Sequence, residues 1–144
     1  MDCVSDNFTL SDLAAALGIV QLEKPEKTNA RRGEIVGKYN DAFDEEDWIE
    51  TPVVKDYATK LSHHNYVIRV DGRDELHRYL NEKGISTSVH YVPNNHYRVY
   101  REFRGDTPVA DEVWKKLLTL PLFPDLTDEQ VDFIVSSVIE FGKS

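Results

Sequence analysis

The stretch NYVIRVDGRDELHRYLNEKGISTSVHY, Asn65–Tyr91, decides the expected fold. Its first part, Asn65–Val70, has the composition of a β-strand, with Tyr66, Ile68 and Val70 on one face and Val67 and Arg69 on the other. A helix is expected over Arg73–Lys83, with Gly84 at the position that favours a left-handed C-terminal cap. Alternation returns over Ile85–Tyr91 and predicts a second strand. Two strands joined by a helix of this length should belong to one sheet that carries helices on a face.

The rest of the chain supplies those helices. Apolar residues at helical spacing predict helices over four stretches, and Pro52 permits one edge strand. The helices are expected at Thr9–Lys24, Glu26–Phe43, Pro108–Leu118 and Thr127–Gly142, and the edge strand at Thr51–Tyr57. The predicted fold class is α+β, with a small, mostly antiparallel sheet packed against helices.

Length and charge limit the class of protein. A chain of 144 residues suits a single domain over 1–144, with N-terminal helices over about 9–43 and an α+β core over about 50–144. The net charge of −9 and the pI near 5.0 argue against nucleic acid or an anionic membrane as a partner. Cys3 is the only cysteine, and no signal peptide is visible in the first thirty residues. We therefore expect a soluble, cytoplasmic domain.

Common catalytic and metal-binding patterns are missing from the sequence. The pair His63-His64 and the spacing of His90 and His96 match neither a helical zinc motif nor a cysteine–histidine cage, so we expect no metal site. There is no G-x-S-x-G motif and no glycine-rich phosphate loop. Composition and spacing alone therefore identify no enzyme.

Four stretches, in order, resemble the motifs of one known family. They are NFTLSDLAAALGIVQLEK (Asn7–Lys24), ARRGEIVGKYNDAF (Ala30–Phe43), GISTSVHYVPNNHY (Gly84–Tyr97) and TPVADEVWKKLLTLPLFPDLTDEQVDFIV (Thr107–Val135). On these motifs the chain is identified as a member of the DegT/DnrJ/EryC1/StrS family of pyridoxal-phosphate-dependent nucleotide-sugar aminotransferases, several of which serve polysaccharide biosynthesis. The resemblance covers nearly the whole chain.

The resemblance places this chain downstream of the family's Schiff-base lysine. It implies the small C-terminal domain of a fold-type I aminotransferase, a class that in intact form uses pyridoxal 5'-phosphate to transfer an amino group to a nucleotide-linked keto sugar. None of the nine lysines matches the Schiff-base motif. Because the chemistry needs that lysine, the resemblance implies a truncated domain that is inactive alone and holds no cofactor. The expected partners are a separate lysine-bearing N-terminal domain or a second copy, and a nucleotide sugar once the enzyme is intact.

One cofactor-binding residue follows from the resemblance. Asn7 matches a family asparagine that reaches the cofactor phosphate of the neighbouring subunit. Thr9 stands where the family often has Arg or Lys, which removes a charge-assisted phosphate contact.

The resemblance also implies a substrate-facing loop. His90 and Tyr91 match the family's His-Tyr pair, and Asn94 matches an asparagine found there in some members. A following family histidine aligns either with Asn95 or, if the loop is one residue longer, with His96. These residues are the candidate substrate-binding set.

Two plainer interpretations remain open. In the first, Tyr91 and Val89 pack, Pro93 turns the chain, and the polar groups of the loop are only solvated. In the second, the chain is a non-catalytic interaction or dimerisation module that kept the fold. The apolar side of the first helix, which includes Leu13 and Leu17, favours association in either case.

Overall fold

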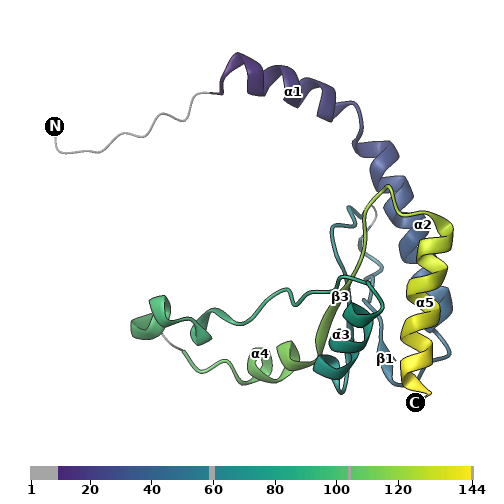
Figure 1. Cartoon of the computed structure of the whole chain (residues 1–144). Helices are drawn as coiled ribbons and strands as arrows, with labels where there is room; N and C mark the ends of the chain where they lie inside the picture. The colour runs from purple at the N-terminus through teal and green to yellow at the C-terminus, as the bar shows by residue number, and fades with distance from the viewer. Residues whose placement is uncertain (1–9, 59–60, 104, 144) are drawn as a thin grey trace.

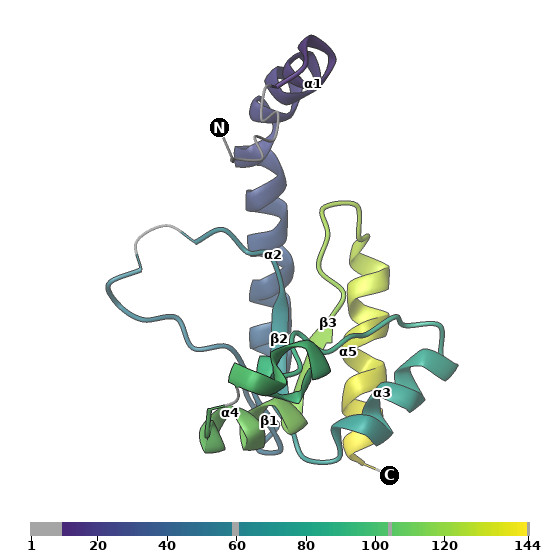
Figure 2. The same ribbon diagram turned by 90° about the vertical axis from the view of Figure 1, so that its left-hand side faces the viewer.

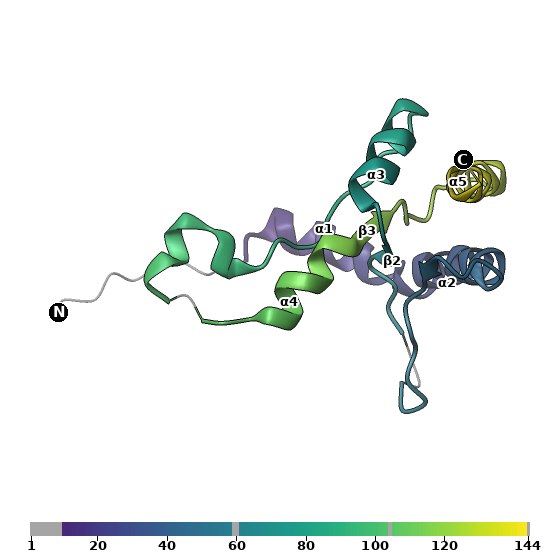
Figure 3. The same cartoon turned by 90° about the horizontal axis from the view of Figure 1, so that it is seen from below.

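The computed structural model describes residues 10–58, 61–103 and 105–143. Its elements, labelled as in Figure 1, are α1 (Asp12–Leu22), α2 (Pro25–Phe43), β1 (Ile49–Glu50), β2 (Tyr66–Val70), α3 (Arg73–Glu82), η1 (Asn94–His96), η2 (Arg98–Phe103), α4 (Pro108–Val113), η3 (Trp114–Lys116), β3 (Leu117–Leu120) and α5 (Asp128–Gly142). The strands form one antiparallel sheet in the order β1-β2-β3. Helices α2, α3 and α5 lie on one side of it, and α4 lies on the other (Figures 1 and 3). The α+β class is thereby confirmed.

The core lies between the sheet and the helices. In β2, Tyr66, Ile68 and Val70 are buried, and their register places Ile68 opposite Leu118 and Tyr66 opposite Leu120 of β3. Apolar residues from α2, α3 and α5 close over this face: Ile35, Tyr39, Phe43, Leu76, Leu80, Val131, Ile134 and Val138. The alternation expected over Asn65–Val70 is therefore confirmed.

Local capping signals are confirmed at two helix ends. Thr127 caps α5 through both bonds of a capping box with Gln130. Gly84 follows α3 with φ +79°, the left-handed conformation that glycine adopts at no steric cost. The cap of α1 is Ser11, whose hydroxyl accepts from the amide of Ala14, and the expected start at Thr9 lies outside the described residues.

The helix expected over Pro108–Leu118 is too long. The α-helix ends at Val113, and after a short 3₁₀ turn Leu117–Leu120 form β3. The run LLTL carries no period of its own, since a short apolar run fits a buried strand as well as a helix. Pairing of all four residues with β2 decides the outcome.

The strand expected over Ile85–Tyr91 is also wrong. The segment is extended, but its only pairing is one antiparallel bridge between Ser88 and Thr119. The next hydrogen-bonded position along this ladder would place Ser86 opposite Pro121, which has no N–H to donate. The carbonyl of Pro121 already accepts from the hydroxyl of Tyr39 at 2.9 Å. The missing N–H therefore ends the ladder on the Ser86 side, and on the other side the chain bends away at His90.

The edge strand lies earlier than expected. Thr51–Tyr57 is not a strand, and the pairing involves Ile49–Glu50, which lie opposite Val70 and Arg69. Pro52 lies two residues after Glu50 and cannot donate to a ladder, so the strand ends before it. An ion pair between Glu50 and Arg69 joins the two strands.

Helix α1 projects away from the body of the molecule. It extends past the N-terminal end of α2, where no other described element covers it (Figures 1 and 2). None of its residues is buried. Leu13 is 75% exposed and Leu17 is 62% exposed. No helix in the described part of the chain is long and apolar enough to cross a membrane.

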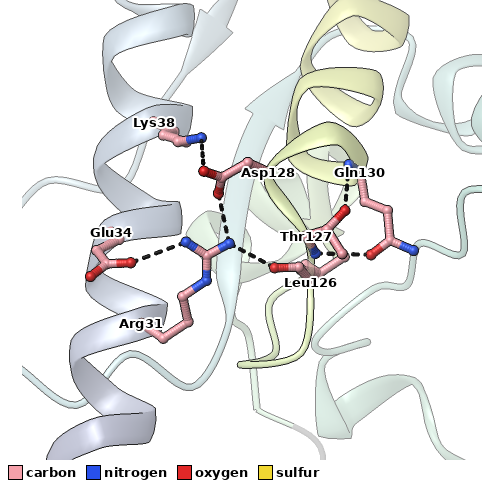
Figure 4. A network of polar contacts seen from close by, with 7 residues as sticks. All are labelled: Arg31, Glu34, Lys38, Leu126, Thr127, Asp128 and Gln130. Carbon is pink, nitrogen blue, oxygen red and sulfur yellow. Dashed lines mark hydrogen bonds and ion pairs between the residues drawn. The ribbon is translucent and has the colours of Figure 1, made fainter.

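A clasp of ion pairs joins α2 to the start of α5 (Figure 4). Arg31 lies 2.8 Å from Asp128 and donates to the carbonyl of Leu126 at 2.7 Å, while Lys38 lies 3.1 Å from the other oxygen of Asp128. Hydrogen bonds from Arg31 first, and then from Lys38, hold the pKa of Asp128 below its ordinary value of 3.8.

Truncating the core face of β2 should destabilise the fold strongly. We expect Ile68→Ala to cost about 2–5 kcal/mol in the free energy of unfolding, because it leaves a cavity between the sheet and the helices. Val67→Ala, on the opposite and less buried face, is the control and should cost clearly less. Urea unfolding followed by circular dichroism measures both, and equal losses would contradict the register.

The clasp should make stability depend on pH at the acid end. Because the folded pKa of Asp128 is depressed, its contribution is fully present above the unfolded pKa and is lost as pH falls through the folded pKa. Asp128→Asn should therefore lower Tm at pH 7, and the difference from the wild type should shrink at pH values below about 4. Asp132→Asn, an exposed change one turn along α5, is the matched control. A pH-independent difference for Asp128→Asn would contradict the clasp.

Candidate functional site

The candidate loop forms an arm that leaves the sheet. We call residues 91–107 the arm, of which the structure describes all except Arg104. It starts three residues beyond the Ser88–Thr119 bridge, carries η1 and η2, and returns into α4. Figures 1 and 3 show it extending away from the sheet on the side opposite α2 and α5.

His90 is anchored at the base of the arm. Its Nδ1 lies 2.8 Å from the hydroxyl of Thr119 and 3.4 Å from that of Ser88. Thr119 is buried, so the ring is held against the sheet beside the last backbone pair. Tyr91 packs edge-on against the His90 ring and is otherwise open to solvent, with 70% of its surface exposed, so the interpretation in which Tyr91 packs holds for this one ring contact.

In the turn η1, the side chains of Asn95 and His96 both bind one acidic residue, Asp111. His96 Nε2 lies 2.6 Å from Asp111 Oδ1, and because a carboxylate only accepts, the ring nitrogen is the donor. The Asn95 amide donates to the Thr107 hydroxyl at 2.8 Å and to Asp111 Oδ1 at 3.2 Å. The hydrogen bond from His96 first, with those from Asn95 and Thr107, holds the pKa of Asp111 below its ordinary value of 3.8.

Asn94 differs from its neighbours. Its side chain is exposed and makes no hydrogen bond within the described part of the chain. It lines an open cavity of about 420 Å³, together with Tyr100, Phe103 and Thr107. Aromatic faces, an amide and a hydroxyl are the groups that recognise sugars and nucleotides.

The candidates therefore fall into two groups. His90 and Tyr91 lie at the base of the arm, and Asn94 and His96 lie at η1, with no contact between the groups among the described residues. Asn7, the candidate cofactor contact, lies outside the described residues and stays a prediction. The sequence did not single out Thr119 or Asp111, although both lie within the stretch Thr107–Val135, because each reaches its partner from an element that is distant in sequence.

The described lysines do not lie in the kind of environment that a Schiff-base lysine needs. A Schiff-base lysine must lie in a desolvated or cationic environment that lowers its pKa. Of the eight described lysines, four are held in ion pairs with carboxylates: Lys38, Lys83, Lys115 and Lys116. The other four are exposed: Lys24, Lys27, Lys55 and Lys143.

Metal chemistry gains no support from the geometry. Among the residues that the structure describes, no group of three or more His, Cys, Asp or Glu could hold a metal ion. His90 and His96 turn to different partners, Thr119 and Asp111.

Comparison with known proteins identifies the family. The model of the DegT/DnrJ/EryC1/StrS aminotransferase family matches residues 2–139, so the chain belongs to that family, as its motifs indicate. The spore coat polysaccharide biosynthesis protein SpsC of Bacillus subtilis is 36% identical over 147 aligned residues, which cover 94% of this chain and 38% of that protein.

Solved structures show the same relation. Helicobacter pylori PseC, an aminotransferase involved in the biosynthesis of pseudoaminic acid, superposes with a TM-score of 0.87 at 26% identity, covering 99% of this chain and 40% of that one. A candidate sugar aminotransferase of Streptococcus pneumoniae, solved in its PLP form, gives a TM-score of 0.85 at 30% identity, with 94% and 36% covered. The chain thus spans less than half the length of the relatives it matches.

The contact between His96 and Asp111 should be measurable as a carboxyl titration. His96→Phe keeps an aromatic ring but removes the donor, so the pKa of Asp111 should rise toward 3.8. His96→Gln, which keeps an N–H donor, should restore part of the depression. Carboxyl ¹³C NMR over pH 2–6 measures the shift, with His64→Phe as the control. An unchanged Asp111 titration in His96→Phe would disprove the contact.

Proposed function

We propose that this chain is the C-terminal part of a pyridoxal-phosphate-dependent aminotransferase that acts on nucleotide-linked keto sugars. Its role is to supply the substrate-facing arm and the cofactor-phosphate contact Asn7 to a site whose Schiff-base lysine lies elsewhere. Alone, the chain is inactive and binds no cofactor specifically. Family membership and the partial coverage of relatives support this proposal.

The distribution of exposed apolar residues carries the proposal. On α1, Leu13, Leu17 and Leu22 are exposed, and on the arm Val99 is 76% and Phe103 is 82% exposed. Figure 1 shows α1 and the arm projecting toward the same side of the molecule, away from α5. Exposed apolar patches on two projecting elements mark an interface, and a partner of domain size would cover both at once.

Reconstitution tests the proposal. The chain is expressed alone and together with the part of the Bacillus relative that it does not match, and each sample is treated with pyridoxal 5'-phosphate and borohydride. Alone, the chain should show no single saturable trapped lysine, because a neutral hydrogen bond from Asn7 contributes only about 0.5–1.5 kcal/mol. The mixture should trap one cofactor per pair and show amino transfer. Stoichiometric trapping at one lysine of this chain alone, identified by mass spectrometry, would refute the proposal.

A second candidate function is favoured by α1 itself. The helix is apolar around its circumference, with Leu13 and Leu17 on one side and Ile19 and Leu22 on another, and such helices are normally buried. A non-catalytic dimerisation module would bury α1 against a second copy of the chain.

Self-association through α1 can be measured directly. We expect light scattering to show a dimer at high concentration, and the double change Leu13→Gln with Leu17→Gln to shift it to monomer. Phe133→Gln removes an apolar residue of similar exposure from α5 and is the control. If the wild-type chain is monomeric throughout, the dimerisation module is excluded, and the aminotransferase proposal is unaffected.

A further inference from the structure

The turn η1 is connected to the sheet through a series of side chains. The His96 ring meets the ring of Trp114 edge-to-face, with centroids 5.4 Å apart and planes at 68°. The guanidinium of Arg73 lies 5.6 Å from the centroid of the same indole. Arg73 is buried in the first turn of α3 and donates to the carbonyl of Leu117 in β3 at 3.4 Å. The series therefore runs from the sheet to the tip of the turn.

Asp111 fixes the other end of this series. It accepts from both His96 and Asn95, and the Thr107 hydroxyl donates to its Oδ2 at 3.1 Å. Asp111 and Trp114 come from neighbouring elements, α4 and η3. One short segment therefore contacts the His96 side chain twice, through its Nε2 atom and through the ring contact with Trp114. The side chains of Asn95 and His96, two neighbouring residues of the turn, therefore both donate a hydrogen bond to Asp111.

The side chain of Asn94, the third residue of the turn, has no hydrogen bond within the described part of the chain. Asn94 keeps a free side-chain amide on the wall of the 420 Å³ cavity, although its own carbonyl accepts from the amide of Tyr97 at 3.1 Å and so fixes its backbone. Two anchored residues beside one free residue is the arrangement expected of a group held ready for a ligand.

We propose that Asp111 and Trp114 are positioning residues that hold η1, so that Asn94 contacts the nucleotide-linked sugar while His96 serves as an anchor. This inference rests on the function proposed above. It changes the role expected for His96 from substrate contact to support.

This network is better suited to fixing the orientation of η1 than to stabilising the fold. The Oδ1 atom of Asn95 and the Nε1 atom of Trp114 are both buried and have no hydrogen-bond partner within the described residues. Buried polar atoms without partners destabilise a fold, so a network that contains two of them is an inefficient stabiliser. What it does provide is a single orientation of the turn.

The first experiment uses the chain as it is and needs no activity. In Asp111→Ala, backbone ¹⁵N relaxation should show residues 94–97 becoming mobile, while the amides of α5 keep their hydrogen-exchange protection. Trp114→Leu should act in the same direction. Glu112→Ala, on the same helix and paired only with Lys115, is the matched control and should leave the turn ordered. A turn that stays ordered in Asp111→Ala would overturn the proposal.

The second experiment uses the reconstituted enzyme. Asn94→Ala and Asp111→Ala should each raise KM for the nucleotide sugar about fivefold, the size of one lost hydrogen bond, with kcat and KM for the amino donor unchanged. The double variant should show no further rise, because Asp111 acts through Asn94. His96→Gln keeps a donor to Asp111 but loses the ring contact with Trp114, so any rise in KM in this variant should come with a mobile turn.

Additive effects of the two changes, or a His96→Gln defect with an ordered turn, would overturn the assignment. If the wild-type mixture shows no amino transfer at all, the proposed function fails, and the relaxation measurement still decides whether Asp111 anchors the turn.

Discussion

The backbone pair between Ser88 and Thr119 is the point from which the arm leaves the sheet. Strand β3 ends at Leu120, and Pro121 offers no N–H to the extended segment that runs beside it. Its carbonyl is occupied by the hydroxyl of Tyr39, a buried residue of α2 whose pKa burial raises, which keeps it a neutral donor. Among the described residues this segment has one backbone pair with the sheet, Ser88 with Thr119, and Pro121 ends the ladder on the Ser86 side of it. On the other side, the chain bends at His90 and continues into the arm.

Elements that depend on local signals could be predicted from the sequence, whereas elements that depend on pairing between distant segments could not. Helices α2, α3 and α5 were predicted within a few residues, because Pro25, Gly84 and the Thr127 capping box are local signals. The strand β2 was predicted because its alternation is local too. In contrast, β3 and the failed strand depend on which segment pairs with which, and neither LLTL nor Ile85–Tyr91 contains that information. Pairing between distant segments decided both.

The candidate site shows the same difference between local and distant information. Apart from Asn7, the residues named by the family resemblance lie in the arm or at its base, but the residues that hold them come from other elements. Thr119 comes from β3, Asp111 from α4 and Arg73 from α3, and each contact spans at least fifteen positions in sequence. A motif records the side chains that face a ligand more readily than those that orient them. The supporting residues are visible only when the fold brings them together.

In the enzyme proposed above, the arrangement of the arm would give a physical reason for dividing the site between two parts of the protein. Hydrogen bonds to an exposed amide such as Asn94 compete with water, so the proposed contact with a sugar would be weak while the arm is open. Covering the arm with a second domain would exclude water and strengthen every polar contact beneath it. The cost of such a contact also depends on how much freedom the amide loses on binding. Because η1 is already held by Asp111 and Trp114, little ordering remains when the partner closes, and the contact can favour one orientation of the sugar.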